Sequence, residues 1–101
     1  MDYVYSIRVN ENKLPAKALM AIKRLTGLSL SDIKEATMND LSVFACGCAD
    51  DEGLLLIKQI YDELSGLGVS AKIYWYDSEE PYQNLLNAIQ MHREIDEQQY
   101  D

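Results

Sequence analysis

Three short β-prone runs constrain the fold of this chain more than any other feature. In residues 3–9 and again in residues 69–76, apolar or aromatic side chains alternate with others, as in strands that bury one face. Residues 41–46 form a third, shorter run of the same kind. Three such strands are too few to bury their apolar faces alone, so helices must pack against them.

The intervening segments have the apolar spacing of helices. Pro15 suits the first turn of one helix and Gly27 its left-handed end. Ser29 resembles the N-cap of a short second helix. A third helix is expected to end at Gly66, and an apolar stripe that begins at Tyr82 predicts a final one.

The predicted architecture is an α+β fold of two layers in the order βααβαβ. Its sheet has three mostly antiparallel strands, with the helices on one face and an added C-terminal helix. We expect a domain over residues 1–77 and an acidic C-terminal helix and tail over 78–101. Tyr74 and Tyr76 point away from the helices, so the final helix is expected to fold back over them. The alternative is a homodimer in which this helix or the tyrosine face packs against a second copy, so the chain is expected to be a monomer or such a homodimer.

The charge of the chain bears on its partners. Nine basic and 17 acidic residues give a net charge of -8, which disfavours nucleic acid and anionic membranes as partners. The charge is uneven, since residues 1–36 carry +2 and residues 37–101 carry -10. No signal peptide and no apolar run of the ~20 residues that span a bilayer are recognisable, so a cytoplasmic protein is expected.

Residues 18–36, ALMAIKRLTGLSLSDIKEA, carry a helix with basic residues, then Thr-Gly-Leu, then a short helix with lysine and alanine. This pattern resembles the C-terminal domain of the bacterial ribosomal stalk protein, and the likeness extends over residues 3–76. The adaptor of the Clp protease shares that fold. The resemblance implies a module that recruits other proteins through its first two helices, with Leu19, Lys23 and Lys34 at the binding face. Met20 stands where the family has a lysine, and the family's N-terminal dimerisation region has no counterpart, so a ribosomal anchor is not expected.

The first candidate site is a stripe of the first helix. Lys17, Met20 and Arg24 recur three or four residues apart and face away from the predicted core. Charged rims around an adaptable methionine are typical of protein-binding surfaces, although a solvated helix face has the same pattern. The predicted binding set for an acidic partner protein is Lys17, Leu19, Met20, Lys23, Arg24 and Lys34.

An alternative site is the acidic half of the chain. Its acids could bind a basic toxin or nuclease, which would make the chain an immunity or inhibitor protein. Helix capping and solubility explain the same residues without a partner. The set is Asp50, Asp51, Glu52, Asp62 and Glu63.

A small metal- or thiol-dependent protein is a second alternative, based on Cys46 and Cys48. A metal site needs three or four ligands, and His92 is the single histidine of the chain. Neither a phosphate-binding glycine loop nor a catalytic motif is recognisable. We therefore expect a protein without catalytic activity and without a cofactor.

Overall fold

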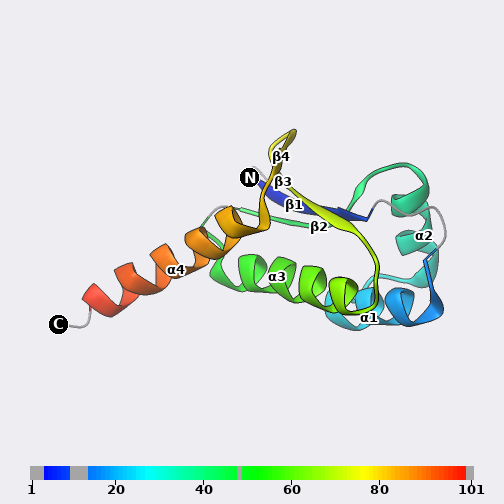
Figure 1. The fold of residues 1–101 in the computed structure, drawn as a ribbon, viewed down its shortest axis with the longest axis horizontal. Helices are drawn as coiled ribbons and strands as arrows, with labels where there is room; N and C mark the ends of the chain where they lie inside the picture. Colours follow the sequence, from blue (N-terminus) through cyan, green and yellow to red (C-terminus); the bar gives the residue numbers. More distant parts are fainter. Residues whose placement is uncertain (1–3, 10–13, 48, 100–101) are drawn as a thin grey trace.

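The computed structural model describes residues 4–9, 14–47 and 49–99, with side chains described up to residue 91. Its elements are β1 (Tyr5–Val9), α1 (Ala16–Thr26), α2 (Leu30–Met38), β2 (Ser42–Cys46), α3 (Asp51–Gly66), β3 (Ala71–Trp75), β4 (Ser78–Glu80) and α4 (Tyr82–Gln99). The molecule is elongated, with α1 and α2 at one end and α4 at the other (Figure 1). The predicted α+β class is confirmed.

The sheet is antiparallel, in the order β2-β1-β3-β4. Tyr5 of the central strand lies opposite Cys46 of β2 and Trp75 of β3. The prediction of a three-stranded sheet was wrong, because the polar segment after β3 turns back and pairs with it. Tyr76 makes this turn possible with a positive φ of 54°, so that Ser78 lies opposite Trp75. The expected boundary after residue 77 falls inside this hairpin.

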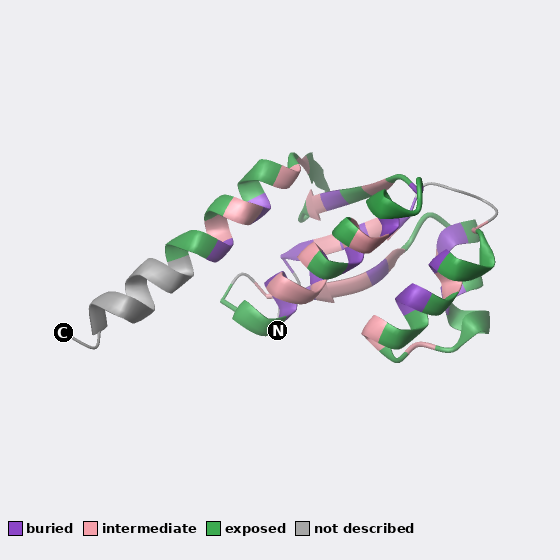
Figure 2. Cartoon of the chain, turned by 60° about the horizontal axis from the view of Figure 1, so that its bottom comes forward, coloured by how far each residue is buried: buried purple, intermediate pink, exposed green. Residues whose placement is uncertain are grey.

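The core lies between the sheet and the helices α1 and α3 (Figure 2). From the sheet it takes the alternating residues that the sequence predicted, such as Ile7 and Ile73, both almost fully buried. Each such side chain contributes about 1.5–3 kcal/mol to the free energy of unfolding. The largest fully buried helical side chains are Ile22 of α1, Ile33 of α2, Leu54, Ile57, Ile60 and Leu64 of α3, and Leu85 of α4.

The helix ends use the local chemistry that the sequence indicated. Gly27 has a left-handed φ of 78°, and its N–H donates to the Lys23 carbonyl over 2.8 Å at the end of α1. Ser29 Oγ accepts a hydrogen bond from the Asp32 N–H over 3.1 Å and caps α2. Asp50 Oδ1 accepts one from the Gly53 N–H over 3.0 Å and caps α3. These caps fix where α2 and α3 start.

Helix α4 packs beside α3 instead of over the tyrosine face of the sheet. The Tyr82 ring stacks on Tyr61 of α3 with centroids 4.3 Å apart, and Leu85 and Ile89 are buried. The expected fold-back over Tyr74 and Tyr76 was therefore wrong. The sequence predicted the apolar stripe of α4, but this stripe is buried against the side of α3 and not against the sheet.

The outer face of the sheet is covered in part by its own long side chains. The Arg8 guanidinium lies 4.3 Å from the centre of the Tyr74 ring, a cation–π contact. An oxygen of Asp40 lies 4.0 Å from Arg8, and Glu79 lies 3.7 Å from Lys72. This explains how Tyr74 becomes half-buried without a covering helix.

Candidate functional site

A groove of about 690 Å³ runs between α1 and the C-terminal end of α3. It exists because small residues face each other there, namely Ala16 and Ala21 on α1 and Gly66 on α3. Short side chains leave space between two neighbouring helices that larger ones would fill. The groove is open to solvent and has a mainly apolar lining.

Two large apolar side chains stand at this groove in contact with water. Met20 is 55% exposed and Leu67 is 39% exposed. Methionine is flexible and polarisable, so it adapts to differently shaped partners. Large apolar residues that gather at an open groove, rather than singly, indicate a binding surface.

An ion pair links the two helices across the groove. Arg24 Nη2 donates to both carboxylate oxygens of Glu63, over 2.6 and 2.5 Å. Both side chains are substantially exposed, so the pair adds about 1 kcal/mol or less to stability. Arg24 belonged to the predicted basic set and Glu63 to the predicted acidic set, and here each neutralises the other. Among the described residues no ion pair includes Lys17, which therefore gives the groove rim its positive charge.

The structure gathers half of the predicted binding set at the groove. Lys17, Met20 and Arg24 line it. Leu19 is half-buried against the core, and Lys23 lies about 100° further round α1 than Arg24, outside the lining. Lys34 is exposed on α2 and also lies outside it. Sequence reasoning missed Leu67 and the small residues Ala16, Ala21 and Gly66. Their small size was visible in the sequence, but not that they face one another across a groove.

The predicted acidic set does not form one surface. Asp50, Asp51 and Glu52 lie at the start of α3, whereas Asp62 and Glu63 lie about 16 Å further along the helix. These last two also point to opposite sides, Asp62 to Tyr82 of α4 and Glu63 to α1. Asp50, Asp62 and Glu63 are engaged in hydrogen bonds within the chain.

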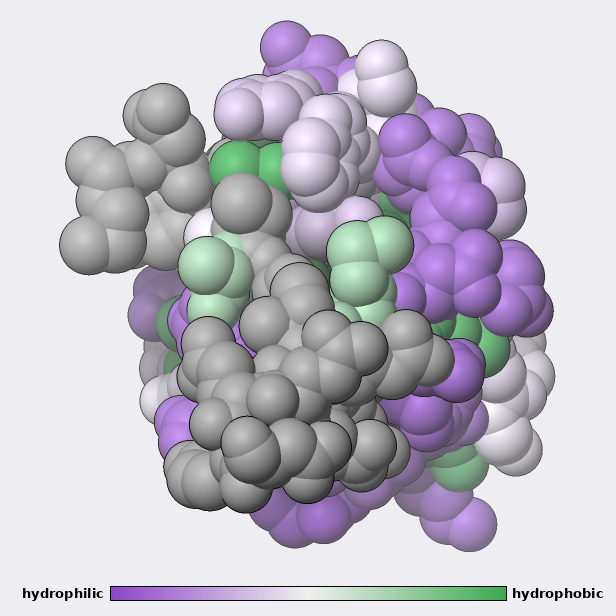
Figure 3. Space-filling view, turned by 90° about the vertical axis from the view of Figure 1, so that its left-hand side faces the viewer, coloured by the Kyte–Doolittle hydropathy of each residue, from purple (hydrophilic) through white to green (hydrophobic). Residues whose placement is uncertain are grey.

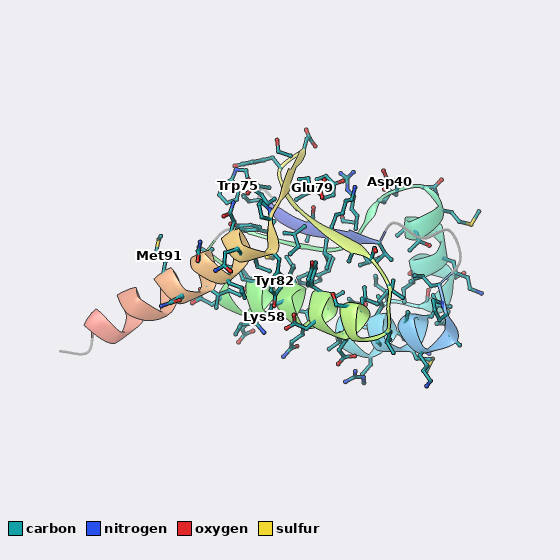
Figure 4. All side chains as sticks on the ribbon, viewed as in Figure 1. Asp40, Lys58, Trp75, Glu79, Tyr82 and Met91 are labelled. Carbon is teal, nitrogen blue, oxygen red and sulfur yellow. The ribbon has the colours of Figure 1, made fainter. Side chains whose placement is uncertain are left out.

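Asp62 joins α3 to α4 in a small polar cluster. It accepts hydrogen bonds from Lys58 Nζ over 2.7 Å and from the Tyr82 hydroxyl over 2.6 Å, and Figure 4 shows Lys58 and Tyr82 on neighbouring helices. Burial alone would raise the pKa of Asp62, but these two bonds outweigh it and hold the pKa below its usual value of 3.8. Burial and the bond to Asp62 raise the pKa of Tyr82 above 10.0, and Asp62 raises that of Lys58. The cluster links α4 to α3 through the hydrogen bond from the Tyr82 hydroxyl to Asp62.

The remaining candidates have less structural support. Cys46 is buried and outside any disulfide, while Cys48 and the side chain of His92 lie outside the described residues. Where side chains are described, no three of His, Cys, Asp and Glu gather as metal ligands would. Within the same part of the chain, no helix is both long and apolar enough to cross a membrane.

Comparison with known proteins gives no match: no family model, curated protein or solved structure is significantly similar to this chain. The resemblance to the stalk C-terminal domain therefore stays a prediction from the sequence. A function has to be inferred from the geometry of the described surface.

Proposed function

We propose that this chain is a non-catalytic protein-binding module of the stalk type, and that the α1–α3 groove holds an acidic, amphipathic helix of a partner protein. The observation that carries the proposal is the groove itself, in which Met20 and Leu67 meet water beside Lys17. Amphipathic helices bind in apolar grooves by inserting side chains from one face. Of the positions that the sequence resemblance places at a binding face, Met20 lines this groove, whereas Leu19, Lys23 and Lys34 lie outside its lining.

The charges around the groove favour acidic residues in the partner. Lys17 offers an ammonium group at the rim, and Arg24 can exchange Glu63 for a carboxylate of the partner. Exchange costs little because the exposed Arg24–Glu63 pair adds little stability. Charge complementarity of this kind chiefly accelerates association and weakens as salt increases.

A cytoplasmic location goes with this proposal. Cys46 is a buried thiol outside any disulfide, as is usual for proteins of reducing compartments. The inhibitor alternative has less support, because Asp50, Asp62 and Glu63 of its acidic set are already engaged in hydrogen bonds within the chain.

The test uses a synthetic amphipathic peptide of leucine and glutamate and follows backbone amide shifts of the ¹⁵N-labelled protein. We expect saturable shifts in residues 16–24 and 63–67, and binding weakened about tenfold by Met20→Glu, which places a charge against the apolar floor. Met38→Glu is the matched control, since Met38 is 73% exposed and lies on α2 outside the groove.

The same variants then identify the natural partner in lysate of the host. The partner should be retained by the parent and by Met38→Glu, and lost with Met20→Glu. Equal binding of peptide and partner to Met20→Glu and to the parent would refute the groove as the binding site. If Lys17→Glu left binding unchanged at low salt, the acidic character of the partner would be refuted.

A further inference from the structure

A second groove, of about 490 Å³, lies where α4 meets the sheet. Its floor comes from Tyr5 and Trp75 of the sheet, and one wall from Ala88 and Met91 of α4. It shares no lining residue with the α1–α3 groove. In Figure 4, Trp75 and Met91 lie on the same upper side of α4.

Trp75 is a rigid part of this groove with an accessible ring. Tyr5 meets it edge-on with centroids 4.9 Å apart, and Tyr76 does so on another side at 5.6 Å. The side chain is nevertheless 37% exposed, and Met91 across the groove is 59% exposed. A fixed tryptophan facing a flexible methionine is a typical anchor site for a partner side chain.

The surroundings of the second groove are acidic. Glu80 supplies a carboxylate to its described lining, and Asn84 Nδ2 donates to this carboxylate over 2.6 Å. Two of the segments that line the groove continue into further acids, Asp50 directly after Ala49 and Asp77 two residues after Trp75. Figure 3 views this end of the molecule, where hydrophobic and strongly hydrophilic patches adjoin. The charge is thus opposite to that of Lys17 at the first groove.

We propose that this second groove binds a basic segment of a partner protein, with an apolar side chain seated between Trp75 and Met91 and an arginine at Glu80. A guanidinium pairs with a carboxylate and also stacks on an indole ring, so Glu80 and Trp75 together suit arginine better than any other side chain. A second copy of this chain suits the groove less well. A two-fold dimer there would bring the acids of both copies together.

The second groove is inferred independently of the α1–α3 groove, whereas the bridging role described next also rests on the proposed function. A chain with a basic groove at α1 and an acidic groove at α4 can hold two partners of opposite charge at once. It would then act as a bridge between two proteins rather than as a simple docking domain.

Trp75 is the single tryptophan of the chain, so its fluorescence reports directly on the second groove. The probe is a short synthetic peptide of arginine and leucine, compared with a twin in which glutamate replaces arginine. We expect a saturable change in Trp75 emission with the arginine peptide alone, which weakens as salt is added. Glu80→Lys should weaken binding about tenfold, and Met91→Ser should weaken it by a similar factor without disturbing the core.

Glu79→Lys is the matched control, because Glu79 is next to Glu80 in sequence but pairs with Lys72 on the outer face of the sheet. It should leave peptide binding close to that of the parent. Equal affinity of Glu80→Lys and Glu79→Lys, or equal binding of the two peptides, would overturn the proposal. A dimer in sedimentation that Met91→Ser dissociates would also overturn it, by assigning the groove to a second copy. These results leave the α1–α3 groove untouched, so the two proposals can fail separately.

Discussion

Replacing Gly53 with alanine is expected to destabilise the domain by about 2 kcal/mol, although it puts a better helix former into α3. The reason is the close approach of α3 to β2. A Cβ atom at Gly53 would lie 2.5 Å from Cys46 Cβ, 2.9 Å from Cys46 Sγ and 2.7 Å from Asp50 Oδ2. The first two atoms are held by the strand, so the helix itself has to move.

The magnitude follows from three contributions. Overpacking a core contact costs about 1–3 kcal/mol. Displacing the Asp50 carboxylate, which caps the Gly53 N–H, costs about 1 kcal/mol more. The higher helix propensity of alanine returns at most about 1 kcal/mol. The net loss of about 2 kcal/mol corresponds to a decrease in Tm of about 10 °C for a domain of this size.

The assay is urea and thermal unfolding followed by circular dichroism. Gly66→Ala is the matched control in the same helix, because a Cβ there meets no atom within 4 Å, and it should not destabilise. Adding Cys46→Gly to Gly53→Ala should restore part of the loss, while Cys46→Ala should not, because it keeps the clashing Cβ. If Gly53→Ala proved as stable as Gly66→Ala, the reasoning about close approach would be refuted.

Three further predictions concern the contacts of α3 with its neighbours. Leu85→Ala should lower the free energy of unfolding in urea by about 2–5 kcal/mol, since Leu85 is fully buried; a loss below 1 kcal/mol would mean that α4 does not hold to α3. The lowered pKa of Asp62 stabilises the fold above pH 3.8, and this contribution is lost as the pH falls through the pKa of Asp62 in the folded protein, so Asp62→Asn should flatten the acid side of a curve of stability against pH. The raised pKa of Tyr82 stabilises the fold below pH 10.0, and this contribution is lost as the pH rises through the pKa of Tyr82 in the folded protein. Tyr82→Phe should therefore flatten the alkaline side of the same curve. A double-mutant cycle on Arg24→Ala and Glu63→Ala should give a coupling of about 1 kcal/mol or less, and a much larger value would contradict a readily exchanged pair.

Much of the fold could be predicted because local patterns agreed with the final packing. The alternation in β1 and β3 and the cap at Ser29 are properties of short segments, so they can be read one segment at a time. Strand β4 could not be predicted in this way, since Ser78-Glu79-Glu80 has no strand propensity and pairs only because β3 offers a free edge. The place of α4 was missed for a related reason, because an apolar stripe shows that a helix is buried but not which surface buries it.

Half of the candidate site could be predicted, because local helix geometry places some of its residues and long-range packing places the others. Lys17, Met20 and Arg24 share one stripe of α1, which helix geometry alone gives. Glu63 and Leu67 reach the groove only because α3 packs beside α1, a long-range contact with no local sign. The second groove was not predicted at all, since Ala49, Trp75 and Met91 come from three distant segments.

The position of β1 in the middle of the sheet has a consequence for synthesis of the chain. Strand β1 needs neighbours from Ser42–Cys46 and Ala71–Trp75, and both are synthesised after it, the second one only after α3. Until Ala71–Trp75 has been made, β1 keeps at least one open edge, which is a state that invites pairing with other nascent chains. A chain released before residue 71 is therefore expected to be a target for chaperones, while α1 and α2 can already form from local contacts.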